Sequence, residues 1–353
     1  MKLDASWLAL PEVAELHRAF ARAGFGLRFV GGCVRDAIMG RAVSELDAAS
    51  DATPDQMMAL LSQAGIRAIP TGLAHGTVTA RLHDRSIEIT TLRHDVKTDG
   101  RHAEVAFSAS WEEDAKRRDF TMNALYVDAS GELFDPVGGL ADCKARHVRF
   151  IGDPLARIAE DYLRILRYFR FVASVGENRF DDAAMAACRA GKQGIDSLSG
   201  ERIQQELLKL LAAPASHAAM EKLLPLLPIT CAGTGSLARL ESLGVALPLL
   251  KFAALIADVA ALPAIAERLR LSRAQTDWLE RILLSAKTVR ASMDERAQKR
   301  LRRKLSAEDY ASVIKLAYAI SRGEWNDFAP LLGMADWQPP TMPLSAKDLL
   351  AMG

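Results

Sequence analysis

A glycine pair followed by an arginine is the first feature of this chain whose residue types and spacing could do chemistry. In the run FVGGCVRD, at positions 29–36, an apolar strand ends in two glycines and a helix begins. Without side chains at Gly31 and Gly32 the backbone can approach an anion closely, and a helix start favours negative charge. Arg35, one turn into that helix, can pair with phosphate oxygens. The run predicts a triphosphate-binding turn, with an ordinary tight turn as the alternative.

Two acids follow in the run SELDAAS, and they are candidates for a cation site. Alternation along a strand puts Glu45 and Asp47 on the same face. Unpaired carboxylates repel each other, and hard divalent Mg²⁺ prefers such oxygen ligands. Two metal ions there could activate an attacking hydroxyl and neutralise a departing pyrophosphate. The pair therefore predicts magnesium ligands, with a solvated edge strand as the alternative.

A third acid, Glu88, lies in the run SIEITTL among apolar and β-branched residues. An acid in such a strand needs a partner. We expect it either to face the same metal ions as a third catalytic carboxylate or to form a salt bridge with an arginine across the strand pair.

The run KRRDFTMNAL, at positions 116–125, concentrates charge before an apolar stretch that is predicted to be helical. Arg117 and Arg118 could hold phosphate or ribose, and Asp119 could accept a hydrogen bond from a sugar hydroxyl. Asn123 lies one predicted helical turn beyond Asp119. A solvated charge cluster is the usual alternative for such a run.

A polar stripe is predicted on the helix that follows Pro154. Arg157, Asp161, Arg164 and Arg167 recur every three or four residues and so share one face of that helix. Because an aspartate accepts from an exocyclic amine and an arginine donates to ring nitrogen or carbonyl groups, Asp161 with Arg164 could read the edge of cytosine or adenine. For this helix taken alone, a salt-bridged surface is the preferred interpretation.

The elements that must position these residues fall into two halves. Short β-rich runs and short helices alternate over positions 27–153, which predicts an α/β or α+β half with a mixed sheet. After Pro154 apolar residues recur at helical spacing, so the second half is predicted to be nearly all helix. The predicted strands are LRFV, ELDAAS, RAIPT, GTVTARL, SIEITTL, ALYVD and ELFDPV, and the predicted helices of the first half are TPDQMMALLSQAG and SWEEDAKRRDFTMNAL.

The amino-acid composition limits how the protein can bind a charged partner. Half of the 353 residues are apolar, which excludes a disordered chain, and 45 basic residues balance 44 acidic ones. A polyanion must therefore bind a local basic patch. The candidate patch is a helical cluster, and a solvated helix end explains it equally well; its members are Lys299, Arg300, Arg302, Arg303 and Lys304.

No export or membrane segment is expected. Acids interrupt the first 20 residues where a signal peptide is apolar, and Asp258 and Pro263 interrupt the most apolar window, at positions 252–266. The four cysteines lie far apart without a CxxC pair, which favours reduced thiols over disulfides or zinc. We therefore expect a cytoplasmic protein that binds neither membrane nor zinc.

Five motifs, taken in order, resemble the class II branch of the tRNA nucleotidyltransferase and bacterial poly(A) polymerase family. They are GGCVRD, ELD, HGT, RRDFTMNAL and EDYLRILRYFRF, and the likeness covers positions 25–215. The resemblance implies an α+β polymerase-β-type nucleotidyltransferase head at 1–153, a helical neck with a nucleotide-selecting motif at 154–215, and a helical body and tail that bind tRNA at 216–353. It also implies template-independent addition of C and A to the 3′ end of tRNA from CTP and ATP, with Mg²⁺ and release of pyrophosphate.

The same resemblance implies roles for single residues. Gly32 and Arg35 would contact the triphosphate, Glu45 and Asp47 would bind magnesium, and Arg118 and Asp119 would contact the nucleotide sugar and phosphates. Asp161 and Arg164 would select CTP or ATP, and Arg167 would assist at the phosphates. The run ERIQQELLKLL would support the selecting helix from behind.

One position departs from the family pattern, which has two aspartates where this chain has Glu45 and Asp47. Because magnesium tolerates little distortion, the additional methylene of Glu45 predicts a working but slower enzyme. A catalytically impaired RNA-binding relative is one alternative. A poly(A) polymerase is the other, but the tail MADWQPPTMPLSAKDLLAMG lacks the strong basic charge that would favour it.

Overall fold

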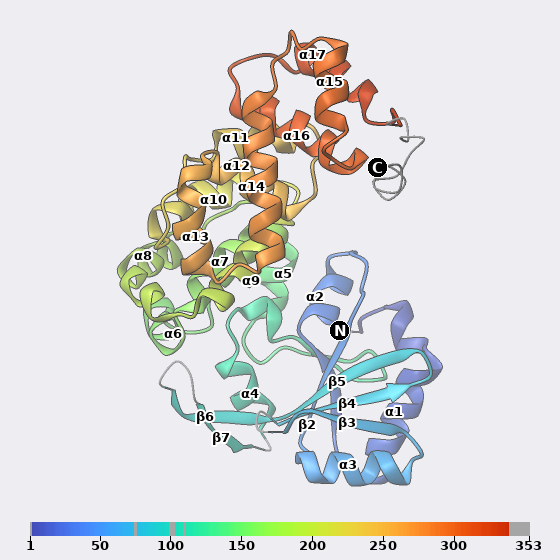
Figure 1. Cartoon of the computed structure of the whole chain (residues 1–353). Helices are drawn as coiled ribbons and strands as arrows, with labels where there is room; N and C mark the ends of the chain where they lie inside the picture. Colours follow the sequence, from blue (N-terminus) through green and yellow to red (C-terminus); the bar gives the residue numbers. More distant parts are fainter. Residues whose placement is uncertain (1, 74–75, 99–102, 109, 339–353) are drawn as a thin grey trace, which may run out of the picture. The chain divides into compact units, whose positions relative to one another are not determined.

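The structure is a computed structural model that describes residues 2–73, 76–98, 103–108 and 110–338, without the side chains of 94–107 (Figure 1). The chain divides into two compact units, Met1–Leu198 and Ser199–Gly353. His75, in the predicted HGT turn, lies outside the described residues. The functional boundaries expected at 153 and 215 stay predictions, whereas by packing the first unit continues past Pro154 to Leu198.

A seven-stranded mixed sheet forms the centre of the first unit, in the order β3-β4-β5-β2-β1-β8-β9. Strands β2 and β5 pair in parallel, and the other neighbours are antiparallel. The strands are β1 (Leu27–Val30), β2 (Leu46–Ser50), β3 (Arg67–Gly72), β4 (Thr77–Leu82), β5 (Arg85–Thr91), β8 (Tyr126–Val127) and β9 (Leu133–Phe134). All seven lie within the predicted runs or within one residue of them.

Helices and a hairpin complete the first unit. Helices α1 and α3 contact each other and the sheet, and α2 packs on β1 and β2. A separate hairpin, β6 with β7, was not predicted. The bounds are α1 (Pro11–Arg22), α2 (Gly32–Ile38), α3 (Pro54–Gln63), β6 (Arg93–Thr98), β7 (Ala103–Phe107), α4 (Trp111–Arg117), α5 (Gly139–Ala145), α6 (Pro154–Glu160), α7 (Leu163–Ser174) and α8 (Asp182–Ala190).

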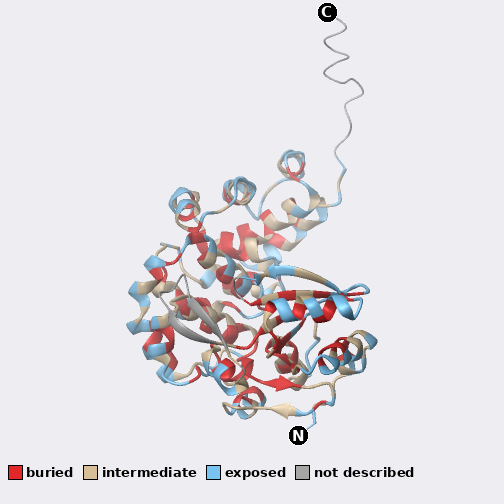
Figure 2. Ribbon diagram, turned by 90° about the horizontal axis from the view of Figure 1, so that it is seen from below, coloured by how far each residue is buried: buried red, intermediate tan, exposed pale blue. Residues whose placement is uncertain are grey.

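Local sequence explains where α3 begins. The Thr53 side chain accepts from the Gln56 N–H, the Gln56 side chain accepts from the Thr53 N–H, and Pro54 takes the first helical position. The predicted cap is confirmed. Figure 2 shows the buried residues concentrated along the strands and on one side of many helices, as amphipathic patterning requires.

The helix predicted over KRRDFTMNAL is wrong. Helix α4 ends at Arg117, Arg118 is extended (φ −68°, ψ 164°), and only a 3₁₀ turn, η3 (Thr121–Asn123), follows. Tertiary packing overrides the helical pattern, because Phe120 pairs with Phe150 in a β-bridge and is fully buried. Its ring lies 4.9 Å from that of Phe150.

The continuous helix predicted after Pro154 is also wrong. Helix α6 ends at Glu160 and α7 begins at Leu163, so Asp161 lies at a joint with φ −153° and ψ 108°. The Asp161 carboxylate accepts from the Leu163 N–H at 3.0 Å, a local hydrogen bond that competes with the helical ladder. The predicted single stripe is therefore divided between two helices.

The second unit contains helices only, among the residues that the structure describes. They are α9 (Gly200–Leu211), α10 (His217–Leu223), α11 (Gly235–Ser242), α12 (Pro248–Ile256), α13 (Leu262–Leu269), α14 (Arg273–Thr288), α15 (Glu295–Arg302), α16 (Ala307–Ile320) and α17 (Trp325–Phe328), with 3₁₀ turns between some of them. No single described helix has the length and apolar composition to cross a membrane; α12 and Val259–Leu269 meet that test only as a pair bent by 99°.

An ion pair with a fully buried lysine lies in the second unit. The Lys251 ammonium, with no exposed side-chain surface, donates to the Glu241 carboxylate at 3.0 Å and to the Ala213 carbonyl at 2.7 Å. Ser216 and His217 also donate to Glu241. Burial alone would raise the pKa of Glu241, but these hydrogen bonds and the Lys251 charge hold that pKa below its usual range.

Replacing Glu241 by glutamine should lower the free energy of unfolding by about 3 kcal/mol, because it leaves the buried Lys251 charge without a counter-ion. Urea unfolding followed by circular dichroism measures this loss. The double variant Glu241→Gln/Lys251→Met should recover part of it, since both charges are then gone. Wild-type stability of the single variant would contradict the assignment.

Candidate nucleotide and metal site

The glycine turn lies at the end of β1. Gly31 adopts φ +78° and ψ −124°, a conformation open mainly to glycine, and its carbonyl accepts the Arg35 N–H at 3.0 Å. A β-carbon placed on Gly31 would lie 3.9 Å from a guanidinium nitrogen of Arg118. The turn and the KRRD segment, predicted from separate motifs, therefore meet in the structure.

The three predicted acids lie on neighbouring strands. Glu45 immediately precedes β2, and the parallel register sets Asp47 of β2 beside Glu88 of β5. Leu46 between the first two acids is buried, whereas Glu45, Asp47 and Glu88 are exposed. Thr79 of β4, not an arginine, lies opposite Glu88. This register brings Glu88 to the other acids and removes the basis for the predicted cross-strand salt bridge.

The surroundings of Asp47 disfavour its ionised form. Desolvation by the surrounding protein raises its pKa to about 6, with further contributions from Glu88 and Glu45 and an opposing one from Arg118. The three acids share one face of the sheet, but their side chains are not close enough together to form a complete metal site. Among the described residues, no group of three His, Cys, Asp or Glu side chains could hold a metal ion as it stands. A carboxylate whose ionised form is disfavoured by its neighbours is one that a cation would stabilise.

Arg118 is held in place by residues that sequence reasoning missed. Asp114 is fully buried and accepts from Arg118 at 3.0 Å and from the Tyr126 hydroxyl at 2.6 Å. Burial alone would raise the pKa of Asp114, but Arg118, Arg117 and Tyr126 lower it. The Asp114 charge in turn raises the pKa of Arg118 despite its desolvation. The spacing of three and four residues from Asp114 to the two arginines was the available signal.

A chain of polar contacts joins the glycine-turn helix to α7. Arg35 donates to both carboxylate oxygens of Asp36 at 3.0 Å and to Asn123 Oδ1 at 2.8 Å. Asn123 Nδ2 donates to Asp119 at 3.1 Å, and Arg167 donates to the same Asp119 through two nitrogens, one of them at 2.8 Å. Asp119 is 8% exposed, so this is a largely buried ion pair. The predicted neighbours Asp119 and Asn123 do meet, although no α-helix joins them.

Phe171 of α7 lies among three guanidinium groups. Those of Arg35, Arg167 and Arg170 are 5.2, 5.7 and 4.3 Å from its ring centroid. Each of these cations is attracted to the electron-rich face of the ring. Arg170 was not among the predicted residues, although the motif RYFRF placed it one turn beyond Arg167.

Arg164 lies beside the end of α4. The Arg164 guanidinium donates to Glu160 at 2.5 Å, to the Arg157 carbonyl at 2.7 Å and to the Arg117 carbonyl at 3.3 Å. The salt-bridged interpretation of this segment therefore holds for Arg164. Asp161, at the helix joint, is half-buried.

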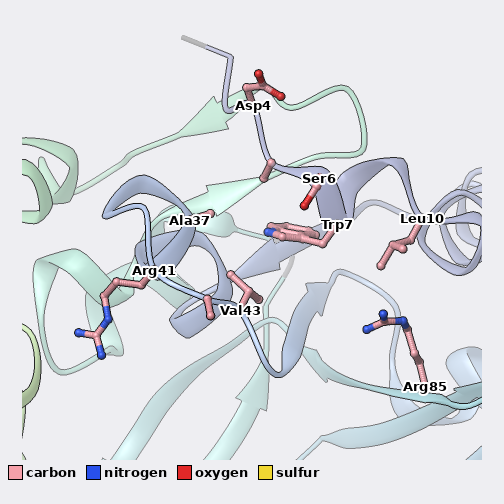
Figure 3. A pocket seen from close by; sticks show the side chains of 10 residues that line it. Asp4, Ser6, Trp7, Leu10, Ala37, Arg41, Val43 and Arg85 are labelled. Atoms are coloured by element: carbon pink, nitrogen blue, oxygen red, sulfur yellow. The ribbon is translucent and has the colours of Figure 1, made fainter. Parts of the chain in front are cut away.

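A pocket of about 460 Å³ lies beside the loop that leads to Glu45 (Figure 3). Its lining includes Trp7, Ala37 of α2, Val43 and Arg85 of β5. None of the three acids and neither glycine of the turn lines it. The pocket is therefore distinct from the candidate site.

Comparisons with known proteins point to one family. Residues 27–149 match the poly A polymerase head domain, and residues 179–226 match the probable RNA and SrmB-binding site of polymerase A. The chain is 46% identical over 199 residues to CCA tRNA nucleotidyltransferase 1, mitochondrial, of Danio rerio, covering 56% of this chain and 46% of the relative. It is 39% identical over 228 residues to the CCA-adding enzyme of Streptococcus gordonii, covering 64% and 55%. The chain thus spans about half the length of these relatives.

Solved structures agree. The Bacillus stearothermophilus CCA-adding enzyme in complex with CTP superposes with a TM-score of 0.73 at 26% identity, covering 92% of this chain and 80% of that one. A tRNA nucleotidyltransferase complexed with a primer tRNA and an incoming ATP analog has a TM-score of 0.72 at 19% identity, covering 90% and 96%, and supports the fold alone.

Fold and comparisons together show a head with the polymerase-β-type fold, followed by helices, and confirm the predicted α+β class. The resemblance predicted from the motifs is confirmed: the chain matches the head and RNA-binding models of poly(A) polymerases and is similar to CCA-adding enzymes.

Proposed function

We propose that this protein adds C and A nucleotides to the 3′ end of tRNA from CTP and ATP, without a nucleic acid template and with release of pyrophosphate. The observation that carries the proposal is the placement of Asp47 and Glu88 side by side in the sheet that also leads into the Gly31 turn under Arg118. The names of the relatives, CCA-adding enzymes, support tRNA as the substrate.

In this proposal the 3′ hydroxyl of the RNA attacks the α-phosphate of the bound nucleotide. The amides of the Gly31–Gly32 turn and the Arg118 guanidinium hold the triphosphate, and Asp114 fixes Arg118 for that task. Asp119 and Arg167 border the sugar and phosphates, joined to Arg35 through Asn123. Catalysis then consists mainly of positioning and charge neutralisation.

Glu45 and Asp47, with Glu88 beside them, would hold magnesium. Members of this family generally use divalent metal ions. The residues fit such an ion, because all three offer hard oxygen donors on one face and the charge of Asp47 is disfavoured by its neighbours. When bound, the metal neutralises charge on the phosphates and favours ionisation of the attacking hydroxyl.

Nucleotide choice is assigned to Asp161 and Arg164. Asp161 lies between two helices, so its carboxylate oxygens can accept hydrogen bonds from a base. The guanidinium of Arg164 supplies the hydrogen-bond donors. Each good bidentate pair with a base is worth about 1–3 kcal/mol of discrimination.

RNA contact in the second unit is assigned to helix α15. Lys299 and Arg303 lie 5.7 and 5.8 Å from the Trp337 ring, and a basic face with an aromatic ring suits RNA. The prediction that Arg302 belongs to the RNA-binding basic cluster is wrong. Arg302 is 7% exposed and donates to the carbonyls of Ala335 and Leu305. It therefore anchors the segment that carries Trp337 and cannot reach a polyanion.

Incorporation of labelled CTP and ATP, singly and together, into tRNAs ending before CCA, after C and after CC tests the proposal. Addition that stops at CCA and disappears with EDTA is the expected result. Unlimited A tails would favour a poly(A) polymerase, addition of C or A alone would mean divided labour, and no incorporation would overturn the proposal. A cytoplasmic location stays a prediction, which subcellular fractionation would test.

Shortening Glu45 to aspartate should leave activity equal or higher, because the shorter side chain restores the family's ligand reach while the charge stays the same. The measurement is kcat/KM for CTP with limiting magnesium. Glu45→Gln, which removes the charge at unchanged length, is the control and should lose activity. A large loss in Glu45→Asp would mean that the site is built around glutamate or that the assignment is wrong.

A further inference from the structure

Arg157 joins the segment that carries Arg118 to the residues assigned to nucleotide choice. One of its nitrogens donates to the Arg118 carbonyl at 2.7 Å and to the Arg117 carbonyl. Its other terminal nitrogen donates to both oxygens of Glu160, at 2.8 and 2.6 Å. Arg157 is 9% exposed, whereas the Glu160 side chain is 30% exposed, so the guanidinium is the buried partner of this ion pair.

The contacts continue from Glu160 to the reading residue. Glu160 accepts from Arg164 at 2.5 Å while it also holds Arg157, so one carboxylate fixes two guanidinium groups. Arg164 also donates to the carbonyls of Arg157 and Arg117, so the hydrogen bonds among these residues form a closed set. Arg164 is therefore oriented by a closed set of partners and not by its own helix alone.

The carbonyls that Arg157 binds lie at the end of α4. Carbonyls at a helix end lack helical partners and carry partial negative charge, so a guanidinium is well matched to them. A simple structural cap would need only these two bonds. The bidentate bond to Glu160 is additional, and it ties the position of the cap to that of Arg164.

We infer that Arg157 is a positioning residue for nucleotide selection: acting through Glu160, it sets Arg164 relative to the segment that carries Arg118. The inference rests on the proposed function, in which Arg164 reads the base. It predicts that losing Arg157 changes which nucleotide is chosen, beyond any change in stability or overall rate. A residue that only caps α4 would change stability and rate but not choice.

The test measures kcat/KM for CTP and for UTP as sole nucleotides on a tRNA that ends before CCA, in wild type, Arg157→Gln and Glu160→Gln. Both variants should lower the ratio of CTP to UTP by about tenfold or more, since a base contact loses its geometry. Arg157→Lys, which can still donate to Glu160 and one carbonyl, should keep more of the ratio than Arg157→Gln.

Arg302→Gln is the matched control, because Arg302 is equally buried and also donates to two backbone carbonyls, but it has no link to the reading residues. It should lower the melting temperature and leave the ratio unchanged. A wild-type ratio in folded Glu160→Gln, or in Arg157→Gln with a lowered melting temperature, would overturn the inference while the proposed function stands. Absence of incorporation by wild type would overturn the proposed function itself.

Discussion

Replacing Asp47 by asparagine is expected to reduce nucleotide addition at least about 100-fold while making the metal-free protein more stable. In the proposed function the loss of activity follows because Asp47, beside Glu88, would no longer supply a ligand for magnesium. The gain in stability follows because the pKa of Asp47 is raised to about 6 in the folded protein, so its ionised form is disfavoured there.

The direction of the pH effect can be worked out from that raised pKa. The folded protein binds the Asp47 proton more tightly than the unfolded chain, whose aspartates titrate near 3.8. Wild type therefore loses stability as pH rises from about 4 to about 6, and Asp47→Asn lacks this loss. In EDTA the variant should melt above wild type at pH 7, with the difference shrinking toward pH 4.

Asp84→Asn is the matched control for this prediction. It removes an exposed acid from the turn between β4 and β5 in the same sheet, outside the residues that pair β2 with β5. Neither activity nor the pH dependence of melting should change. A less stable Asp47→Asn at pH 7 would show that Asp47 has a favourable partner in the folded protein and is not a strained charge.

Replacing Arg167 by methionine is the second change with a large expected effect, a loss of about 3 kcal/mol in the free energy of unfolding. It leaves the Asp119 carboxylate buried without its cation. Burial alone would raise the pKa of Asp119, but Arg167, Asn123 and the Phe120 N–H hold it below its usual range. Differential scanning calorimetry or urea titration measures the loss, which should be accompanied by a loss of activity.

The pH dependence of that variant distinguishes an electrostatic loss from a packing loss. In wild type the lowered pKa of Asp119 contributes stability that is present at neutral pH and is lost as pH falls. Without Arg167 the carboxyl protonates more easily, so the gap between variant and wild type should narrow on acidification. Arg179→Met, which removes an exposed pair with Glu177, should cost less than about 1 kcal/mol at any pH.

Local patterns were sufficient to predict much of the fold. Alternation located all seven strands of the sheet, and the Thr53–Pro54 signal located the start of α3. The predictions failed at two places where a helix was expected to continue. In each place another contact formed in the position where a further helical hydrogen bond would have formed. Phe120 left the helical path to pair with Phe150, and Asp161 used its own carboxylate to end α6.

The candidate site was predictable in its residue types but not in its connections. The glycines, acids and arginines of the motifs do come together in the first unit. The spacing from Asp114 to Arg117 and Arg118 could have predicted their pairing. A single sequence does not reveal that Tyr126 and Arg157 join the same segment. Arg302 illustrates the converse, because a basic run gives no sign that one of its members points inward.

The arginines of the glycine turn and of α7 already have carboxylate partners, Asp36 for Arg35 and Asp119 for Arg167. A polyphosphate that binds there must either displace one of these carboxylates or share the arginine N–H donors with it. It therefore does not meet unpaired guanidinium groups. The net gain in binding free energy is then smaller than the number of arginines suggests. Such moderated affinity suits the proposed function, in which one pyrophosphate must leave before the next nucleotide can enter, because a carboxylate of the protein takes the place of each departing anion.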